Sequence, residues 1–150
     1  MKSALRFETN SDEETRALGG RLAPLLPQGG VVLLIGDLGA GKTTLTKGIV
    51  EALGAAAADE VSSPTFTLIH EYGDPVRISY VDLYRLDTSE EARRAGLEEL
   101  FDRPALTLIE WGERFPELMP KERAEIRIEH TGDDRRAITL SFRAASKGPN

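Results

Sequence analysis

The residues with the clearest capacity for chemistry form a glycine-rich loop at positions 36–43, with the sequence GDLGAGKT. This segment fits the pattern G-x-x-x-x-G-K-[ST], in which glycines let backbone N–H groups approach phosphate oxygens. Lys42 adds a compact positive charge for the β- and γ-phosphates, and the hydroxyl of Thr43 is a suitable ligand for Mg²⁺. The pattern therefore predicts a site for a nucleoside triphosphate.

The segments on either side of the loop are those that a phosphate-binding loop requires. The run VVLLI at 31–35 is short, apolar and rich in β-branched residues, which predicts a strand buried on both faces. Residues 42–53 carry apolar side chains at helical spacing, and Gly54 follows where such a helix would end. The helix would point its positive N-terminal dipole at the phosphates, and Thr44 is expected to face the α-phosphate.

Two carboxylates close other strand-like runs. Asp82 ends VRISYVD and Glu110 ends ALTLIE. A phosphate-binding loop needs an acid that holds or orients the water shell of Mg²⁺. An acid after an apolar run is also costly unless it is paired or bound to a metal. The residues alone leave open which acid holds the metal and which orients water.

The segment SSPTFT at 62–67 lies where many proteins of this kind place a loop that senses the γ-phosphate. Ser63 and Thr65 offer hydroxyls for that purpose, although an ordinary strand start explains the same residues equally well. Trp111 is expected mainly to pack, and it is also placed to cover the nucleotide pocket.

The remaining pattern alternates between helix and strand. Further helices are expected from the capping boxes at Ser11 and Thr88, the second of them running to Leu100 or Phe101, and hairpins are expected around residues 73–75 and 131–134. This alternation predicts an α/β fold of three layers around a central mixed sheet. We expect one domain over residues 1–143, followed by a flexible C-terminal tail at 144–150.

The composition of the chain argues against several classes of function. The chain has 150 residues, no cysteine, two histidines and a formal net charge of −6. A zinc site built from His and Cys is therefore not expected, and neither is unaided binding to nucleic acid. With no disulfides and no apolar run long enough to span a bilayer, a cytoplasmic protein without membrane contacts is expected.

Four motifs in order resemble the TsaE (YjeE) family of small bacterial ATPases: GDLGAGKTT at 36–44, SSPTFTL at 62–68, VDLYRL at 81–86 and LIEWGER at 108–114. The resemblance implies a phosphate-binding-loop fold with a mixed sheet. It also implies a role in making threonylcarbamoyladenosine, the modified base beside the anticodon in tRNAs that read codons beginning with A. Such proteins bind ATP and Mg²⁺, hydrolyse ATP slowly, and dock on the complex of TsaD and TsaB, which handles the tRNA.

The resemblance also implies roles for individual residues. It implies that Thr43 and Glu110 contact Mg²⁺ and that Asp82, with Lys42 and Thr65, serves hydrolysis. The nucleotide-binding positions that it implies are Asp12, Asp37, Leu38, Gly39, Ala40, Gly41, Lys42, Thr43, Thr44 and Trp111. The chain departs from the family at Tyr80-Val81, where relatives often carry a histidine and an aromatic residue.

Two other classes of function fit the phosphate-binding loop: a small-molecule kinase, and a nucleotide-binding scaffold without turnover. The kinase is less favoured because the sequence shows no cluster of arginines for an acceptor. Arg85 and Arg114 are candidates for a cation on the phosphates, but neither is a convincing arginine finger. We therefore expect slow hydrolysis that a partner accelerates.

Overall fold

The computed structural model describes residues 3–27, 29–37, 41–64 and 68–143. Within these ranges seven strands form one sheet in the order β1-β7-β6-β2-β5-β4-β3. The strands are β1 (Ser3–Thr9), β2 (Val31–Ile35), β3 (Ile69–Tyr72), β4 (Ile78–Asp82), β5 (Leu106–Glu110), β6 (Arg123–Gly132) and β7 (Arg135–Arg143). The tail predicted at 144–150 lies outside the described residues.

The sheet is mixed, as predicted. Strand β2 pairs in parallel with both β5 and β6, and β4 pairs in parallel with β5. The pairs β1–β7, β3–β4 and β6–β7 are antiparallel. Every residue of β2, β4 and β5 is buried, which explains why β2 is apolar throughout rather than alternating.

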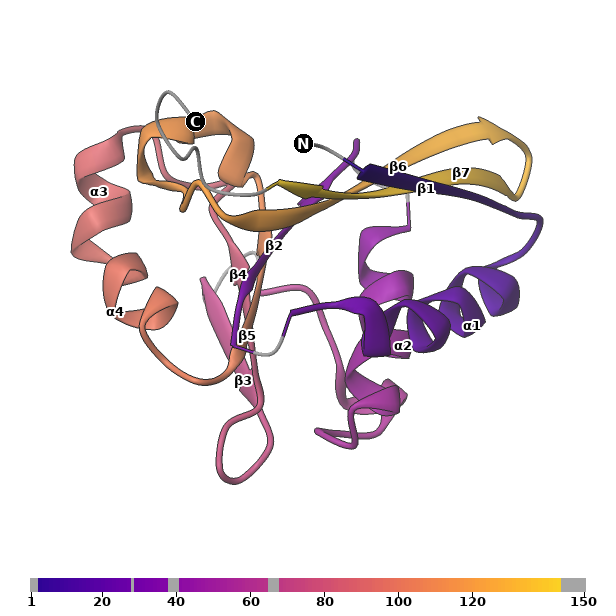
Figure 1. Ribbon diagram of the computed structural model, residues 1–150, viewed down its shortest axis with the longest axis horizontal. Helices are drawn as coiled ribbons and strands as arrows, with labels where there is room; N and C mark the ends of the chain where they lie inside the picture. The colour runs from indigo at the N-terminus through magenta and orange to yellow at the C-terminus, as the bar shows by residue number, and fades with distance from the viewer. Residues whose placement is uncertain (1–2, 28, 38–40, 65–67, 144–150) are drawn as a thin grey trace.

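Helices cover both faces of the sheet (Figure 1). α1 (Asp12–Leu22) and α2 (Lys42–Ala52) lie on one side of the central strands, and α3 (Ser89–Arg94) and α4 (Leu97–Phe101) lie on the other. Each side has its own hydrophobic core, one packed around α1 and α2 and the other around α3 and α4. The α/β fold predicted from the alternation of elements is confirmed. Four short 3₁₀ helices complete the described chain: Ala23–Leu25, Ala58–Glu60, Gly112–Arg114 and Pro116–Leu118.

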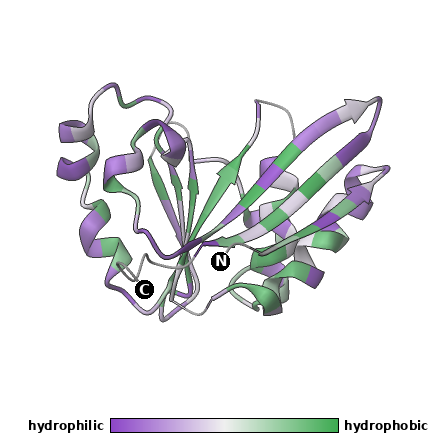
Figure 2. Ribbon diagram, turned by 45° about the horizontal axis from the view of Figure 1, so that its top comes forward, coloured by the Kyte–Doolittle hydropathy of each residue, from purple (hydrophilic) through white to green (hydrophobic). Residues whose placement is uncertain are grey.

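The long hairpin of β6 and β7 shows how one face of the sheet meets solvent. Figure 2 shows apolar and polar bands alternating along these two strands, and buried and more exposed residues alternate along the first half of β6. Strand β1, which the sequence pattern did not predict, pairs along β7 at the edge of the sheet. No helix within the described ranges is long and apolar enough to cross a membrane.

Two helix predictions need correction. The helix expected from Thr88 to Leu100 or Phe101 is broken, because α3 ends at Arg94 and Gly96 has a φ of 89° before α4 begins. A glycine in the left-handed region terminates a helix readily. The capping box that starts α3 is confirmed. At α1, Ser11 Oγ accepts from Glu14 N at 3.1 Å, as predicted, but Glu14 Oε1 accepts from Asn10 N at 2.7 Å instead of from Ser11 N.

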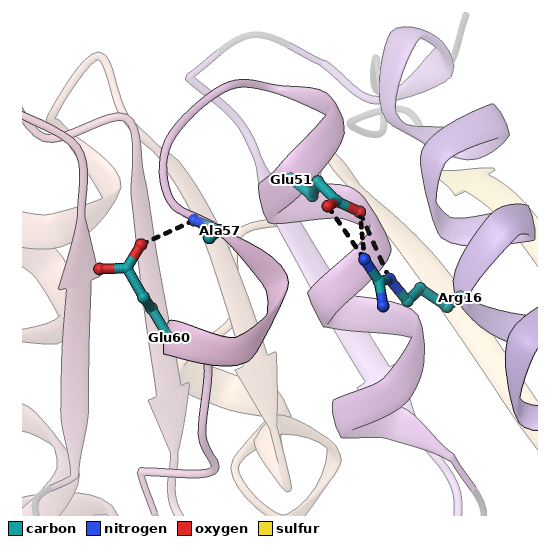
Figure 3. Close-up of polar contacts among 4 residues, drawn as sticks. All are labelled: Arg16, Glu51, Ala57 and Glu60. Carbon is teal, nitrogen blue, oxygen red and sulfur yellow. Dashed lines mark hydrogen bonds and ion pairs between the residues drawn. The ribbon is translucent and has the colours of Figure 1, made fainter.

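Helices α1 and α2 approach each other unusually closely. A Cβ atom at Gly48 would lie 1.9 Å from the carbonyl oxygen of Arg16, and one at Gly19 would lie 2.3 Å from that of Leu45. Only glycine fits at either position. Arg16 also forms a two-pronged ion pair with Glu51 across the same interface, with Nη2 2.9 Å from both carboxylate oxygens (Figure 3).

The connector after α2, whose structure the sequence left open, contains the 3₁₀ helix Ala58–Glu60. Its first turn is closed by the side chain of Glu60, whose Oε1 accepts from Ala57 N at 2.9 Å (Figure 3). This turn leads the chain from α2 toward the segment at 62–67.

Candidate active site

The glycine-rich loop runs from the end of β2 to the start of α2, the order that the motif predicts. Gly41 caps the helix with a φ of 109°, a conformation that L side chains rarely adopt. It has no side-chain cap, so the N–H groups of the first helical turn are directed to the loop. A free helix N-terminus of this kind suits the binding of an anion. Leu38, Gly39 and Ala40 lie outside the described residues.

Lys42 is buried beneath this loop, with 6% of its surface exposed. Its Nζ donates a hydrogen bond to the carbonyl oxygen of Gly36, 2.6 Å away, and lies 4.6 Å from the centre of the Trp111 ring. An ammonium group carries three protons, so the bond to Gly36 leaves capacity for phosphate oxygens.

Thr43, Tyr80 and Glu110 form a chain of polar contacts next to the loop. The Tyr80 hydroxyl donates to Oε2 of Glu110 and lies 3.3 Å from Oγ1 of Thr43. Tyr80 is completely buried, and this burial, together with the charge of Glu110, raises the pKa of its phenol far above the usual range. The phenol therefore stays protonated and remains a hydrogen-bond donor.

The two acids predicted from the sequence lie side by side at the ends of parallel strands. Asp82 of β4 is in register with Glu110 of β5, and both are buried. Burial raises the pKa of Glu110, and the neighbouring charges of Asp82 and Glu113 raise it further; Tyr80 and Lys42 act in the opposite direction. A bound cation would relieve this unfavourable concentration of negative charge.

Asp82 is held by the chain around it. Its Oδ1 accepts from Tyr84 N at 2.9 Å, and its own backbone N–H donates to the carbonyl oxygen of Leu68 at 3.0 Å. Leu68 ends the SSPTFTL motif, so this motif returns to the sheet beside Asp82. Thr65 lies outside the described residues, and its predicted role stays a prediction.

Trp111 packs against Lys42, whose Nζ lies 4.6 Å from the centre of its ring. It follows β5 directly with a φ of 67°, a left-handed conformation that is uncommon outside glycine. Its ring lies 5.3 Å from the ring of Tyr84, which is 46% exposed. The indole Nε1 is buried and has no hydrogen-bond partner among the described residues. Trp111 thus adjoins Lys42, and its role at the nucleotide site stays a prediction.

Comparison with known proteins places this site in a family. A profile described as "Threonylcarbamoyl adenosine biosynthesis protein TsaE" matches residues 9–138. The TsaE protein of Bacillus subtilis (strain 168) is 44% identical over 138 residues, which cover 91% of this chain and 85% of that protein. The TsaE protein of Treponema pallidum (strain Nichols) is 35% identical over 137 residues, covering 91% of this chain and all of that protein. The chain belongs to the TsaE family.

The fold agrees with that assignment. A crystal structure of Bacillus subtilis YdiB superposes with a TM-score of 0.77 at 38% identity and covers 96% of this chain and 88% of that one. TsaE proteins are known as nucleotide-binding ATPases that act with TsaD and TsaB in forming threonylcarbamoyladenosine in tRNA. The resemblance inferred from the four motifs is confirmed.

The side chains beside the loop fit a magnesium ion that is bound together with phosphate. The part of the chain that the structure describes contains no group of three or more His, Cys, Asp or Glu side chains placed to hold a metal ion by themselves. Mg²⁺ at phosphate sites, however, uses one or two carboxylates together with waters and phosphate oxygens. Thr43 and Glu110, joined through one tyrosine hydroxyl, offer the hydroxyl and the carboxylate oxygen that this mode of binding requires.

The structure also brings to the loop one residue that the sequence analysis missed. Arg136 of β7 lies beside Gly41: a Cβ added to that glycine would be 3.6 Å from Arg136 Nε and 3.8 Å from Thr15 Cγ2. Thr15 belongs to α1, whose first residue is the exposed Asp12. Helix α1 and β7 therefore flank the loop. No motif marks Arg136, and only the pairing of β7 with the rest of the sheet places it here.

Proposed function

We propose that this protein is a Mg²⁺-dependent ATPase with a phosphate-binding-loop fold that docks on the TsaD–TsaB complex and supports threonylcarbamoyladenosine formation in tRNAs reading codons that begin with A. The observation that carries the proposal is the meeting of Lys42 and Thr43, at the start of α2, with the buried acids Asp82 and Glu110. The proposal places the protein in the cytoplasm, where it meets tRNA only indirectly, through that complex.

Each residue has a separate task in this proposal. Lys42, the N–H groups of residues 37–44 and the helix dipole bind the phosphates. Thr43 and Glu110 would hold Mg²⁺, which when bound neutralises charge on the phosphate oxygens. Asp82 accepts a hydrogen bond from the attacking water and orients it, assisted by Thr65. Asp12 and Thr44 contact the nucleotide, and Trp111 shields the phosphates from solvent.

Hydrolysis by the protein alone is expected to be slow. An arginine finger accelerates phosphoryl transfer roughly 10³–10⁵-fold. Arg114, one of the two candidates, instead donates to the carbonyl oxygen of Tyr84 at 2.8 Å. A docked partner would raise the rate by supplying or repositioning a cation. With a net charge of −6, the protein also leaves the basic tRNA-binding surface to its partners.

The proposal is tested by measuring ADP release from Mg²⁺-ATP by the purified protein, alone and with TsaD and TsaB. Lys42→Ala provides the blank. A slow basal rate that rises with the partners and vanishes in the blank supports the proposal. Rapid turnover that is indifferent to the partners would refute it, and ADP production that changes when metabolites are added would favour the kinase.

A further inference from the structure

The hydroxyl of Tyr80 lies between the two side chains proposed to hold Mg²⁺. It donates to Oε2 of Glu110 and is 3.3 Å from Oγ1 of Thr43. Tyr80 lies in the middle of β4, which pairs with β3 on one side and β5 on the other, and none of its surface is exposed. The sheet therefore fixes the position of this hydroxyl, and a flexible surface group could not hold the two ligands in the same way.

Counting protons gives the direction of each hydrogen bond. A tyrosine hydroxyl has one proton, and Tyr80 gives it to Glu110. The proton between Thr43 and Tyr80 must then come from Thr43. A threonine oxygen that donates its proton in this way keeps its lone pairs for another partner, and a hydroxyl ligates a metal ion through a lone pair. The same network orients Glu110 by binding one carboxylate oxygen.

The hydrogen bond from Tyr80 also stabilises the buried carboxylate of Glu110. Glu110 is 4% exposed, so water reaches it poorly. A buried carboxylate without a hydrogen-bond donor is unfavourable and tends to rotate or draw in water. The donor on Tyr80 meets that need before any cation is present.

We propose that Tyr80 is a positioning residue for the magnesium site, orienting Thr43 and Glu110 before the ion binds. This inference rests on the proposed function, because it assumes that these two residues are the metal ligands. Partners that orient metal ligands through hydrogen bonds typically change metal affinity by roughly 10–100-fold when they are removed. Tyr80 is thus expected to set the Mg²⁺ requirement and to leave the metal-free affinity for nucleotide unchanged.

The test is the variant Tyr80→Phe, which removes one oxygen and keeps the ring. ATP affinity is measured by calorimetry in EDTA and then across a titration with Mg²⁺. We expect wild-type affinity in EDTA and an increase of roughly 10–100-fold in the Mg²⁺ concentration that gives the half-maximal effect. Ser79→Ala is the matched control, since Ser79 directly precedes Tyr80 in β4 and its hydroxyl is also buried. That hydroxyl forms no hydrogen bond to any described residue. The titration of this control should match that of the wild type.

A second comparison separates positioning from general destabilisation. If Tyr80 acts through Glu110, Tyr80→Phe should change the Mg²⁺ dependence little in a Glu110→Gln background, whereas independent effects would multiply. An unchanged Mg²⁺ titration in Tyr80→Phe would overturn the inference alone. A wild-type protein that binds ATP without any Mg²⁺ dependence would overturn both the inference and the proposed function.

A measurement on the unmutated residue covers the case in which Tyr80→Phe does not fold. The chain has three tyrosines, so the ring carbon that bears each hydroxyl can be labelled and followed by NMR. Signals from Tyr72 and Tyr84 are identified by their loss in Tyr72→Phe and Tyr84→Phe. We expect the Tyr80 signal to shift when Mg²⁺ is added to the ATP complex. A signal that stays in place would overturn the inference.

Discussion

The contact between α1 and α2 makes a sharp prediction for Gly48→Ala. The new methyl group would lie 1.9 Å from the carbonyl oxygen of Arg16, where ordinary contacts begin at 3.4 Å. Both the glycine and its neighbour are parts of helical backbone, so neither can move without shifting its helix. The two helices must separate by more than an ångström, and α2 is the helix that carries Lys42 and Thr43.

The expected loss of stability follows from two opposing effects. Overpacking of this severity costs about 3 kcal/mol, and alanine in place of a helical glycine stabilises by up to about 1 kcal/mol. The net loss of about 2 kcal/mol should lower the Tm of a domain of this size by roughly 4–8 °C. Displacement of α2 should also weaken ATP binding.

The assay is thermal unfolding followed by circular dichroism, with ATP affinity measured on the same samples. Gly20→Ala is the matched control, because its methyl group would meet only Ala52 Cβ at 3.8 Å and the carbonyl oxygen of Gly48 at 3.9 Å. It should raise the Tm slightly and leave ATP binding unchanged. A Gly48→Ala protein as stable as the wild type would refute the close packing of α1 on α2.

Three further outcomes are expected. Asp82→Ala should bind ATP but lose turnover, whereas Lys42→Ala should lose both, as equilibrium binding and ADP release will show; retained turnover in Asp82→Ala would contradict the role of this acid. Thr88→Ala should cost ~1 kcal/mol in urea unfolding because it removes the cap of α3. Backbone hydrogen bonds from Asp87 and Thr88 lower the pKa of Glu91, so this residue contributes stability above its unfolded-state pKa that is lost as the pH falls through its folded-state pKa. Glu91→Gln should therefore be less stable than the wild type at neutral pH and equally stable in acid, and a difference that persists in acid would contradict the capping role.

Most helices and strands could be predicted because the hydrophobic pattern that indicates each of them lies within its own segment. Strand β2 is apolar throughout because both faces of its parallel sheet are covered, and the hairpin of β6 and β7 alternates because one face is more exposed. Strand β1 could not be predicted in the same way. It is an edge strand that leaves Leu5 45% exposed, so its sequence carries little apolar signal.

In the candidate site, too, the local features could be predicted and the long-range contacts could not. The loop and its helix are contiguous in the sequence, so the motif predicts them together. The contact between Tyr80 and Glu110 depends on the parallel register of β4 and β5, and the position of Arg136 depends on how β7 joins the sheet. Such long-range pairings leave no signal in the spacing of residues. The break at Gly96 was missed for a local reason, since apolar spacing continues across it.

The central claim is that nucleotide turnover at Lys42 sustains the work of a partner complex. The most direct measurement is the amount of threonylcarbamoyladenosine formed on tRNA over many turnovers by TsaD and TsaB, with this protein or its Lys42→Ala variant added. We expect continued formation to require the wild-type protein and ATP, and to stop early with the variant. Equal formation with Lys42→Ala would contradict this expectation, because the phosphate-binding loop would then play no part in the reaction.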